Sequence, residues 1–170
     1  MRWLAGLMLL GTLHETPPPT QSPPDSLAPL AFVVGSCWKG SFPDGRKTDT
    51  HCFEWMFDRK FIRDRHVVEG DGGPPYRGET IFGWDAAARR PGYWYWSSEG
   101  FVVTGAVEYQ EGRIIFPSRM TGPKGDVELE ASWTRRGEDA YQVVQRQRTG
   151  KGWATLWTME LRRQGASAPR

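Results

Sequence analysis

The chain has 170 residues, enough for one domain with a full hydrophobic core, and its 22 basic and 20 acidic residues give a net charge of +2. The two signs are interspersed and form no basic stripe, so we expect no nucleic-acid partner. Nine Trp, eight Phe and five Tyr residues are the unusual feature of the composition. Such bulky side chains either fill the interior of a β-barrel or provide a stacking surface for a flat ligand.

The first 29 residues do not have the pattern of a folded domain. Residues 1–15 combine Arg2 with a short apolar run, which is typical of a signal peptide and is too short to span a bilayer. Residues 16–29 are rich in Pro, Ser and Thr and predict a disordered spacer. We therefore place the domain at residues 30–163 and a disordered tail at 164–170. We expect an exported protein, periplasmic or extracellular, without a membrane span.

Turn signals divide the domain at nearly even spacing, and the segments between them are short, aromatic or β-branched, and mostly alternating. Nine turns separate ten strands, and no segment predicts a helix of useful length. The sequence therefore predicts an all-β domain, a single antiparallel up-and-down meander closed into a barrel of about ten strands. The turn signals are Asp44-Gly45, Asp58-Arg59, Gly70 to Pro75, Asp85 to Gly92, Glu99-Gly100, Glu111-Gly112, Gly122 to Asp126, Gly137 to Asp139, and Gly150 to Gly152.

A tight turn at Asp44-Gly45 would place the two cysteines of the chain opposite each other. Cys37 then faces Cys52 on the outer surface, while Trp38 faces His51 on the inner one. Because directly opposed residues lie within disulfide reach, we predict a bridge between these cysteines. Two free thiols in a reducing compartment are the alternative.

A second tight turn at Asp58-Arg59 predicts a polar corner inside the barrel. It pairs His51 with His66 and Phe53 with Asp64, so the inner face carries two histidines and an aspartate. A three-residue turn would reverse the faces and point Arg63 and Arg65 inward, which would bury two guanidinium groups. We therefore prefer the register that encloses the histidines.

The remaining turns assign the tryptophans of the later strands. A two-residue turn at Glu99-Gly100 points Trp94 and Trp96 inward, together with Phe101 and Val103. Alternation along the last strands adds further aromatic residues to the inner face, namely Trp133, Trp153 and Trp157.

The polar corner of His51, Asp64 and His66 has several interpretations. Two histidines and a carboxylate are a donor set that transition metals accept, and Asp64 with His66 could act as an acid–base pair. Polar groups inside a barrel more often form structural hydrogen bonds or orient a ligand. We therefore predict no catalytic residue, no metal site and no cofactor.

The segment from Leu30 to Gly40, with a short helical or 3₁₀ turn followed by Gly35 and Trp38, resembles the start of calycin barrels such as lipocalins, fatty-acid-binding proteins and nitrobindin-like proteins. Three further segments resemble uncharacterised exported barrels of that superfamily. They are Phe53 to Trp55 with Phe61 to His66, Gly78 to Asp85, and Tyr95 to Gly100. The resemblance implies a barrel with an interior ligand site. It does not imply haem, because no histidine follows His66, as the nitrobindin-like pattern would require.

These observations favour a non-enzymatic protein that binds a small apolar or aromatic ligand inside the barrel. One alternative is a secreted interaction or inhibitor module with a side-chain-filled barrel, and another is a small enzyme that uses Asp64 and His66. The sequence does not predict the oligomeric state. The predicted ligand-binding residues are Trp38, His51, Phe53, Trp55, Asp64, His66, Trp94, Trp96, Trp133 and Trp157.

Overall fold

The computed structural model describes residues 25–122 and 125–165. The leader predicted at residues 1–15, most of the spacer at 16–29 and most of the tail at 164–170 lie outside the described residues. The end of the spacer segment lies inside them, and Leu27 is buried there against the core. The ordered fold thus includes residues that precede the expected start of the domain at Leu30.

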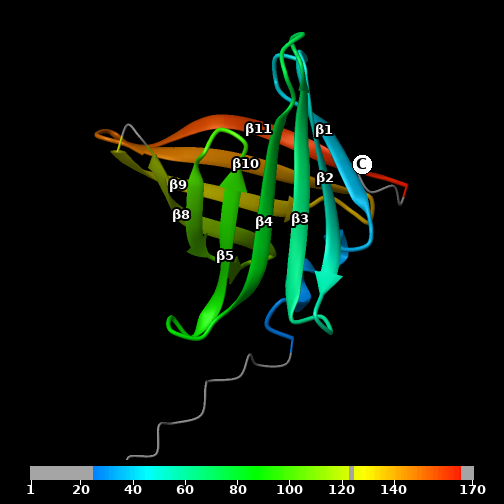
Figure 1. The fold of residues 1–170 in the computed structure, drawn as a ribbon, viewed down its shortest axis with the longest axis vertical. Coiled ribbons are helices and arrows are strands. Elements are labelled where there is room, and N and C mark those ends of the chain that lie inside the picture. Colours follow the sequence, from blue (N-terminus) through cyan, green and yellow to red (C-terminus); the bar gives the residue numbers. More distant parts are fainter. Residues whose placement is uncertain (1–24, 123–124, 166–170) are drawn as a thin grey trace, which may run out of the picture.

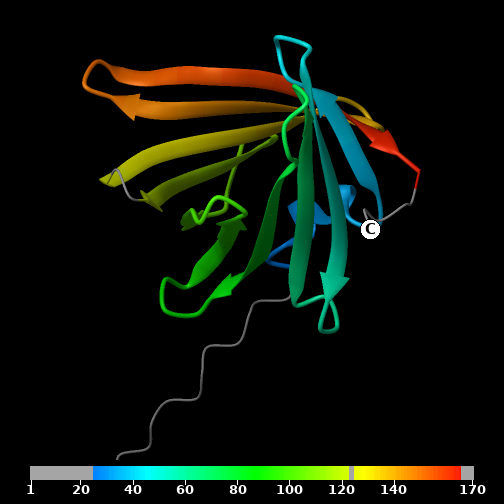
Figure 2. The same cartoon turned by 45° about the horizontal axis from the view of Figure 1, so that its top comes forward.

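The domain is an antiparallel meander barrel preceded by a 3₁₀ helix, as the sequence predicts (Figures 1 and 2). The short segments β6 (Val102–Ala106) and β7 (Glu108–Gln110) are separated by Val107 alone, and both pair with β8 (Arg113–Gly122). They therefore act as one bent strand, and the barrel has ten strands. The β6–β8 pairing closes the sheet. The elements are η1 (Ala28–Val33), β1 (Cys37–Ser41), β2 (Lys47–Met56), β3 (Phe61–Gly70), β4 (Tyr76–Asp85), β5 (Arg90–Ser97), β6 (Val102–Ala106), β7 (Glu108–Gln110), β8 (Arg113–Gly122), β9 (Gly125–Arg135), β10 (Ala140–Thr149) and β11 (Gly152–Gln164).

The first two hairpins have the predicted registers. Cys37 pairs with Cys52 and Trp38 with His51 between β1 and β2, and His51 pairs with His66 between β2 and β3. Both turns are wider than two residues. Phe42 N donates to Lys47 O, so the first turn is 43–46, and the β2–β3 connection runs from Phe57 to Lys60. A loop that gains one residue on each side keeps the same pairing, and so the inner and outer faces are unchanged.

The register between β5 and β6 differs from the prediction, and the difference reverses one strand. The backbone N–H of Ser97 donates to Phe101 O, so the turn contains three residues and ends at Gly100 with φ +82°. A three-residue turn with glycine in the left-handed region is a standard hairpin connection. It turns Tyr93 and Tyr95 inward, and the prediction that Trp94 and Trp96 face the interior was wrong.

A β-bulge in β11 corrects the face of another tryptophan. The pairing of β10 with β11 shifts between Gln145 and Arg146, because Gln145 lies opposite Trp157 but Arg146 lies opposite Thr155, and Leu156 is the extra residue of β11. Because the extra residue reverses the alternation beyond that point, Trp153 lies on the outer face. The guanidinium groups of Arg146 and Arg148 stack over its ring at 5.8 and 5.6 Å.

One end of the barrel is closed by η1 and a packed aromatic core. Trp38 is fully buried, and its Nε1–H donates to Val33 O in η1 at 2.9 Å. Its ring makes edge contacts with Phe32 and Tyr141, with centroids 6.0 and 5.2 Å apart. The guanidinium of Arg163 lies 4.5 Å from the centroid of the same ring. Trp38, near the start of the domain, and Arg163 of β11, near its end, therefore both contact the 3₁₀ helix at this end of the barrel.

Cys37 and Cys52 form a disulfide that spans a sequence separation of 15 residues, with a Cα–Cα distance of 4.1 Å. The bridge joins β1 to β2 next to the closed end, because Phe53 exchanges backbone hydrogen bonds with Gly35 and Ser36. A disulfide is consistent with an oxidising compartment. Among residues 25–122 and 125–165, no helix is both long enough and apolar enough to cross a membrane.

Candidate functional site

The barrel encloses a cavity of about 470 Å³ above the aromatic core. Its floor is formed by core side chains, among them Phe116, Trp133 and Tyr141. Its upper part is lined by Phe42 and Tyr76, which lie next to the β1–β2 and β3–β4 turns, at the end of the barrel opposite the β2–β3 turn (Figure 1). The interior is therefore divided into a filled end and a hollow end.

The predicted apolar wall is divided in the same way. Trp133 and Trp157 line the cavity. Trp38 and Phe53 are buried in the core below it, and Trp55 packs against that core. Trp94 and Trp96 lie on the outer face, and Trp96 is 47% exposed. Most of the predicted aromatic wall is thus replaced by other residues, namely Phe42, Tyr76, Phe82, Tyr93, Tyr95, Phe101, Phe116 and Tyr141.

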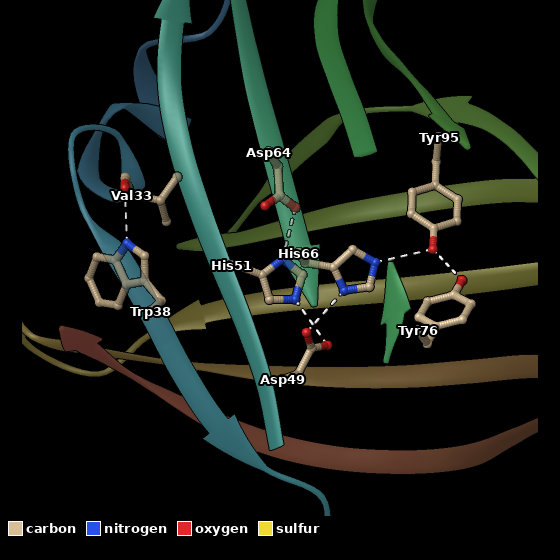
Figure 3. Close-up of polar contacts among 8 residues, drawn as sticks. All are labelled: Val33, Trp38, Asp49, His51, Asp64, His66, Tyr76 and Tyr95. Carbon is tan, nitrogen blue, oxygen red and sulfur yellow. Dashed lines mark hydrogen bonds and ion pairs between the residues drawn. The ribbon is translucent and has the colours of Figure 1, made fainter. Parts of the chain in front are cut away.

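All three predicted polar residues line the cavity, where they belong to a longer chain of hydrogen bonds (Figure 3). His51 Nδ1 lies 2.8 Å from Asp64 Oδ2, and His51 Nε2 lies 3.2 Å from Asp49 Oδ2. Asp49 Oδ1 in turn lies 3.0 Å from His66 Nδ1. The two imidazole rings stack with centroids 4.7 Å apart. One carboxylate therefore joins two parallel histidines.

The chain continues toward the hollow end through two tyrosines that the sequence analysis did not identify. His66 Nε2 lies 3.1 Å from the hydroxyl of Tyr95, which also forms a short hydrogen bond with the hydroxyl of Tyr76. Tyr95 was missed because the two-residue turn assumed at Glu99-Gly100 placed its side chain on the outer face. Tyr76 was missed because it is the first residue of β4, directly after the long β3–β4 connection.

The structure gives the partners of the two residues named in the acid–base hypothesis, Asp64 and His66, which lie two positions apart on β3. Asp64 bonds to His51, and Asp49 bonds to His66. Both are diagonal pairs between β2 and β3, the arrangement in which long side chains of neighbouring strands meet. Asp49 could have been found from the sequence, because it lies two residues before His51 and therefore on the same face.

The electrostatics of this chain are governed by burial and by the two carboxylates. Burial disfavours the charged form of His51, but Asp49 and Asp64 outweigh it and hold the pKa of His51 well above 6.5. Burial likewise opposes ionisation of Asp49, yet His51 and His66 hold the pKa of Asp49 below its usual 3.8. Burial raises the pKa of Tyr95, and its hydrogen bond with Tyr76 adds to the effect. At neutral pH Asp49 is thus a carboxylate, His51 an imidazolium and Tyr95 a neutral phenol.

Gly78 provides the space in which His66 meets Tyr95. It lies between them in the sheet, opposite His66 on β3 and opposite Ser97 on β5. A Cβ atom at this position would overlap both His66 Nε2 and the Tyr95 hydroxyl. The absence of a side chain at residue 78 is therefore a requirement for the hydrogen bond between these two residues.

Two polar atoms at the floor of the cavity have no hydrogen-bond partner among the described residues 25–122 and 125–165. They are Asp64 Oδ1 and the hydroxyl of Tyr141. Both residues are almost inaccessible, with Asp64 2% exposed and Tyr141 fully buried. Buried polar groups usually have a partner, so these atoms are positioned to meet a donor or acceptor brought by a bound molecule or by water. Among the protein groups, Asp49, His51 and His66 could hold a metal ion.

No protein-family model matches the chain, and a comparison with curated proteins finds no significant match. The functional assignment therefore depends on the geometry of the cavity and of the polar chain.

Proposed function

We propose that the protein binds a small, largely apolar molecule in the hollow end of the barrel. The observation that carries this proposal is the cavity of about 470 Å³, which combines an aromatic lining with one localised group of polar side chains. Ligand sites typically have volumes of about 300–1,000 Å³, mostly apolar walls and a few convergent polar groups. The cavity has each of these properties.

The charges that line the cavity define the class of ligand. Asp49 and Asp64 are both buried in its wall. No Lys or Arg side chain lines the cavity in the part of the chain that the structure describes. The one imidazolium there, His51, is already paired with both carboxylates, so an anionic group such as a fatty-acid carboxylate would lose hydration without gaining a free cationic partner. The site suits an uncharged or cationic molecule.

The polar groups also suggest how such a molecule is oriented. Asp64 Oδ1 and the Tyr141 hydroxyl, both without partners among the described residues, lie at the floor. A ligand with a hydrogen-bond donor at one end could satisfy Asp64 there, while its apolar part contacts Phe116, Trp133 and Trp157 above. Burial of flat apolar surface against these rings would provide most of the binding free energy.

Fluorescence titration tests the proposal. We expect a neutral aromatic probe such as 1-aminoanthracene to bind at one site per chain and to quench tryptophan emission, because Trp133 and Trp157 line the cavity. The anionic probe cis-parinaric acid should bind at least tenfold more weakly. Both titrations are performed with a chelator present, so that bound metal does not contribute.

A matched pair of variants on β9 locates the site. Ala131 lines the cavity, so Ala131→Phe should fill part of it and weaken the neutral probe at least tenfold. Ser132 is the next residue of the same strand and points to the other face. Ser132→Phe should leave the affinity unchanged. Equal affinities in the two variants, or no binding of any neutral apolar probe, would rule out the cavity as the ligand site.

The interaction-module hypothesis requires a barrel filled by side chains. The cavity favours ligand binding over that hypothesis, because an interior made only for packing would have no reason to remain hollow.

We also propose that the protein is a calycin-type barrel and that it is exported. The closed meander barrel, the 3₁₀ helix before β1 and the hydrogen bond from Trp38 to that helix support the first proposal. The Cys37–Cys52 disulfide supports the second, because such bonds persist in oxidising compartments. Mass spectrometry of the protein from a periplasmic or culture-medium fraction should find the bridge oxidised. Recovery only from the cytosol with both thiols reduced would contradict export.

A further inference from the structure

We propose that Asp49, His51 and His66 form a binding site for one divalent first-row transition-metal ion. Two imidazoles and one carboxylate are a donor set that zinc, iron, nickel and copper ions accept, whereas magnesium and calcium prefer oxygen donors alone. The inference stands apart from the proposed function, since it concerns the polar chain and not the apolar part of the cavity.

The donor atoms are already grouped as a metal would require. The Asp49 carboxylate faces both rings, at 3.2 Å from His51 Nε2 and 3.0 Å from His66 Nδ1 (Figure 3). One donor atom from each of the three residues lies within 4.8 Å of the others. Two ligands bound tetrahedrally at about 2.0–2.1 Å from zinc lie roughly 3.3 Å apart. Small rotations of the side chains would therefore be enough to enclose an ion.

Each histidine that faces the site has a partner on its other ring nitrogen. His51 Nδ1 lies 2.8 Å from Asp64, and His66 Nε2 lies 3.1 Å from the Tyr95 hydroxyl. Metal-binding histidines are characteristically held in this way by a carboxylate, a carbonyl or another polar group, which fixes the tautomer and the ring orientation. The outer contacts thus leave His51 Nε2 and His66 Nδ1 facing Asp49.

Charge balance supports the same inference. Asp49 and Asp64 are 5% and 2% exposed. Two buried carboxylates need compensating positive charge, and the histidines are the only described residues lining the cavity that could carry it, since none is Lys or Arg. A divalent cation held by two neutral imidazoles would neutralise both carboxylates. The three protein donors leave coordination positions on the cavity side, because all three residues line the cavity.

Zinc titration of the full chain, after removal of metal with a chelator, tests the proposal. Isothermal calorimetry should give one zinc ion per chain, and magnesium should give no saturable binding. Cobalt provides a second readout on the same unaltered protein, because it should produce visible absorption bands in the presence of the chain. X-ray absorption of the zinc-loaded protein should detect two imidazole ligands.

Variants assign the ligands. His51→Gln and His66→Gln should each weaken zinc binding at least 100-fold. Asp64→Asn should weaken it about 10- to 100-fold, since Asp64 is a positioning residue that acts through His51. The remaining histidine of the chain is His14, so His14→Gln is the matched control and should leave the affinity unchanged.

Some outcomes would overturn the proposal. The proposal is wrong if the wild-type protein binds no stoichiometric zinc, or if the X-ray absorption spectrum shows zinc ligation without imidazole. It is also wrong if His66→Gln leaves the zinc affinity unchanged. Near-UV circular dichroism checks that each variant is folded. If a variant fails that check, the spectra of the wild-type protein decide the question alone. The metal alone is the probe, so this result is independent of the binding of 1-aminoanthracene in the presence of chelator.

Discussion

The two ends of the barrel interior use the same alternating strands for opposite purposes. At the closed end Trp38, Phe32 and Tyr141 fill the space with edge contacts, and one hydrogen bond to Val33 satisfies the indole. At the hollow end, the series of hydrogen-bonded side chains that runs from Asp64 through the two histidines to Tyr76 keeps polar groups beside a cavity. The difference indicates that the closed end maintains the fold, which allows the other end to retain buried charge and unfilled space.

Removal of one tryptophan from each end gives the largest predicted contrast. Trp38→Ala should lower the free energy of unfolding by about 4 kcal/mol, because it leaves a large cavity in a fully buried core. Trp157→Ala, at a half-buried position in the cavity wall, should cost clearly less stability but should weaken the neutral probe. Urea unfolding measures the first quantity and fluorescence titration the second. Similar losses of stability in both variants would contradict a division of roles between the two ends.

Two neighbouring arginines of β11 provide the next contrast. Arg163 donates to Ser36 Oγ at 2.6 Å and to Phe32 O at 3.3 Å, which ties β11 to η1. The side chain of Arg162 forms an exposed ion pair with Glu160. We expect Arg163→Met to lower the free energy of unfolding by about 2 kcal/mol and Arg162→Met by roughly 0–0.5 kcal/mol. Urea unfolding of both variants checks the difference.

Gly78 allows the polar chain to be disturbed without removal of any of its side chains. Gly78→Ala should displace His66 or Tyr95, at a cost of about 1.5 kcal/mol. It should also weaken zinc binding, which depends on the orientation of His66. Gly73→Ala is the matched control, since a Cβ at Gly73 contacts nothing. Equal zinc affinities in the two variants would show that Gly78 does not position His66.

Tyr93 lies at the boundary between the filled and hollow ends, and we expect its ionisation to lower the free energy of unfolding slightly at alkaline pH. Burial raises the pKa of Tyr93 to about 12. A pKa that is higher in the folded state contributes stability that is complete below the unfolded value near 10 and is lost as pH rises from about 10 to 12. Between pH 7 and pH 11, Tyr93→Phe should therefore lose about 1 kcal/mol less stability than the wild-type protein. Urea unfolding at the two pH values tests this, and a Tyr93→Phe loss as large as the wild-type loss would contradict it.

Particular residues show how far sequence reasoning extends here. The pairing of Cys37 with Cys52 and of His51 with His66 followed from turn positions, because antiparallel hairpins fix which residues are opposite. The assignment of Trp94 and Trp96 to the interior failed because a two-residue turn was assumed where the chain uses three residues. One additional residue in a turn reverses every side chain of the strand, and the sequence around Glu99-Gly100 is compatible with both lengths.

The sequence by itself determined that this chain is a ten-stranded barrel with an inner face containing two histidines and an aspartate. Turn signals and period-two alternation are local properties, so they can be recognised without a structure. Only the tertiary structure decided which aromatic residues fill the core, which line the cavity, and that Asp49 joins His51 to His66. Those outcomes depend on the combined volumes of side chains from many strands and on diagonal contacts between neighbours, which no single segment of the sequence specifies.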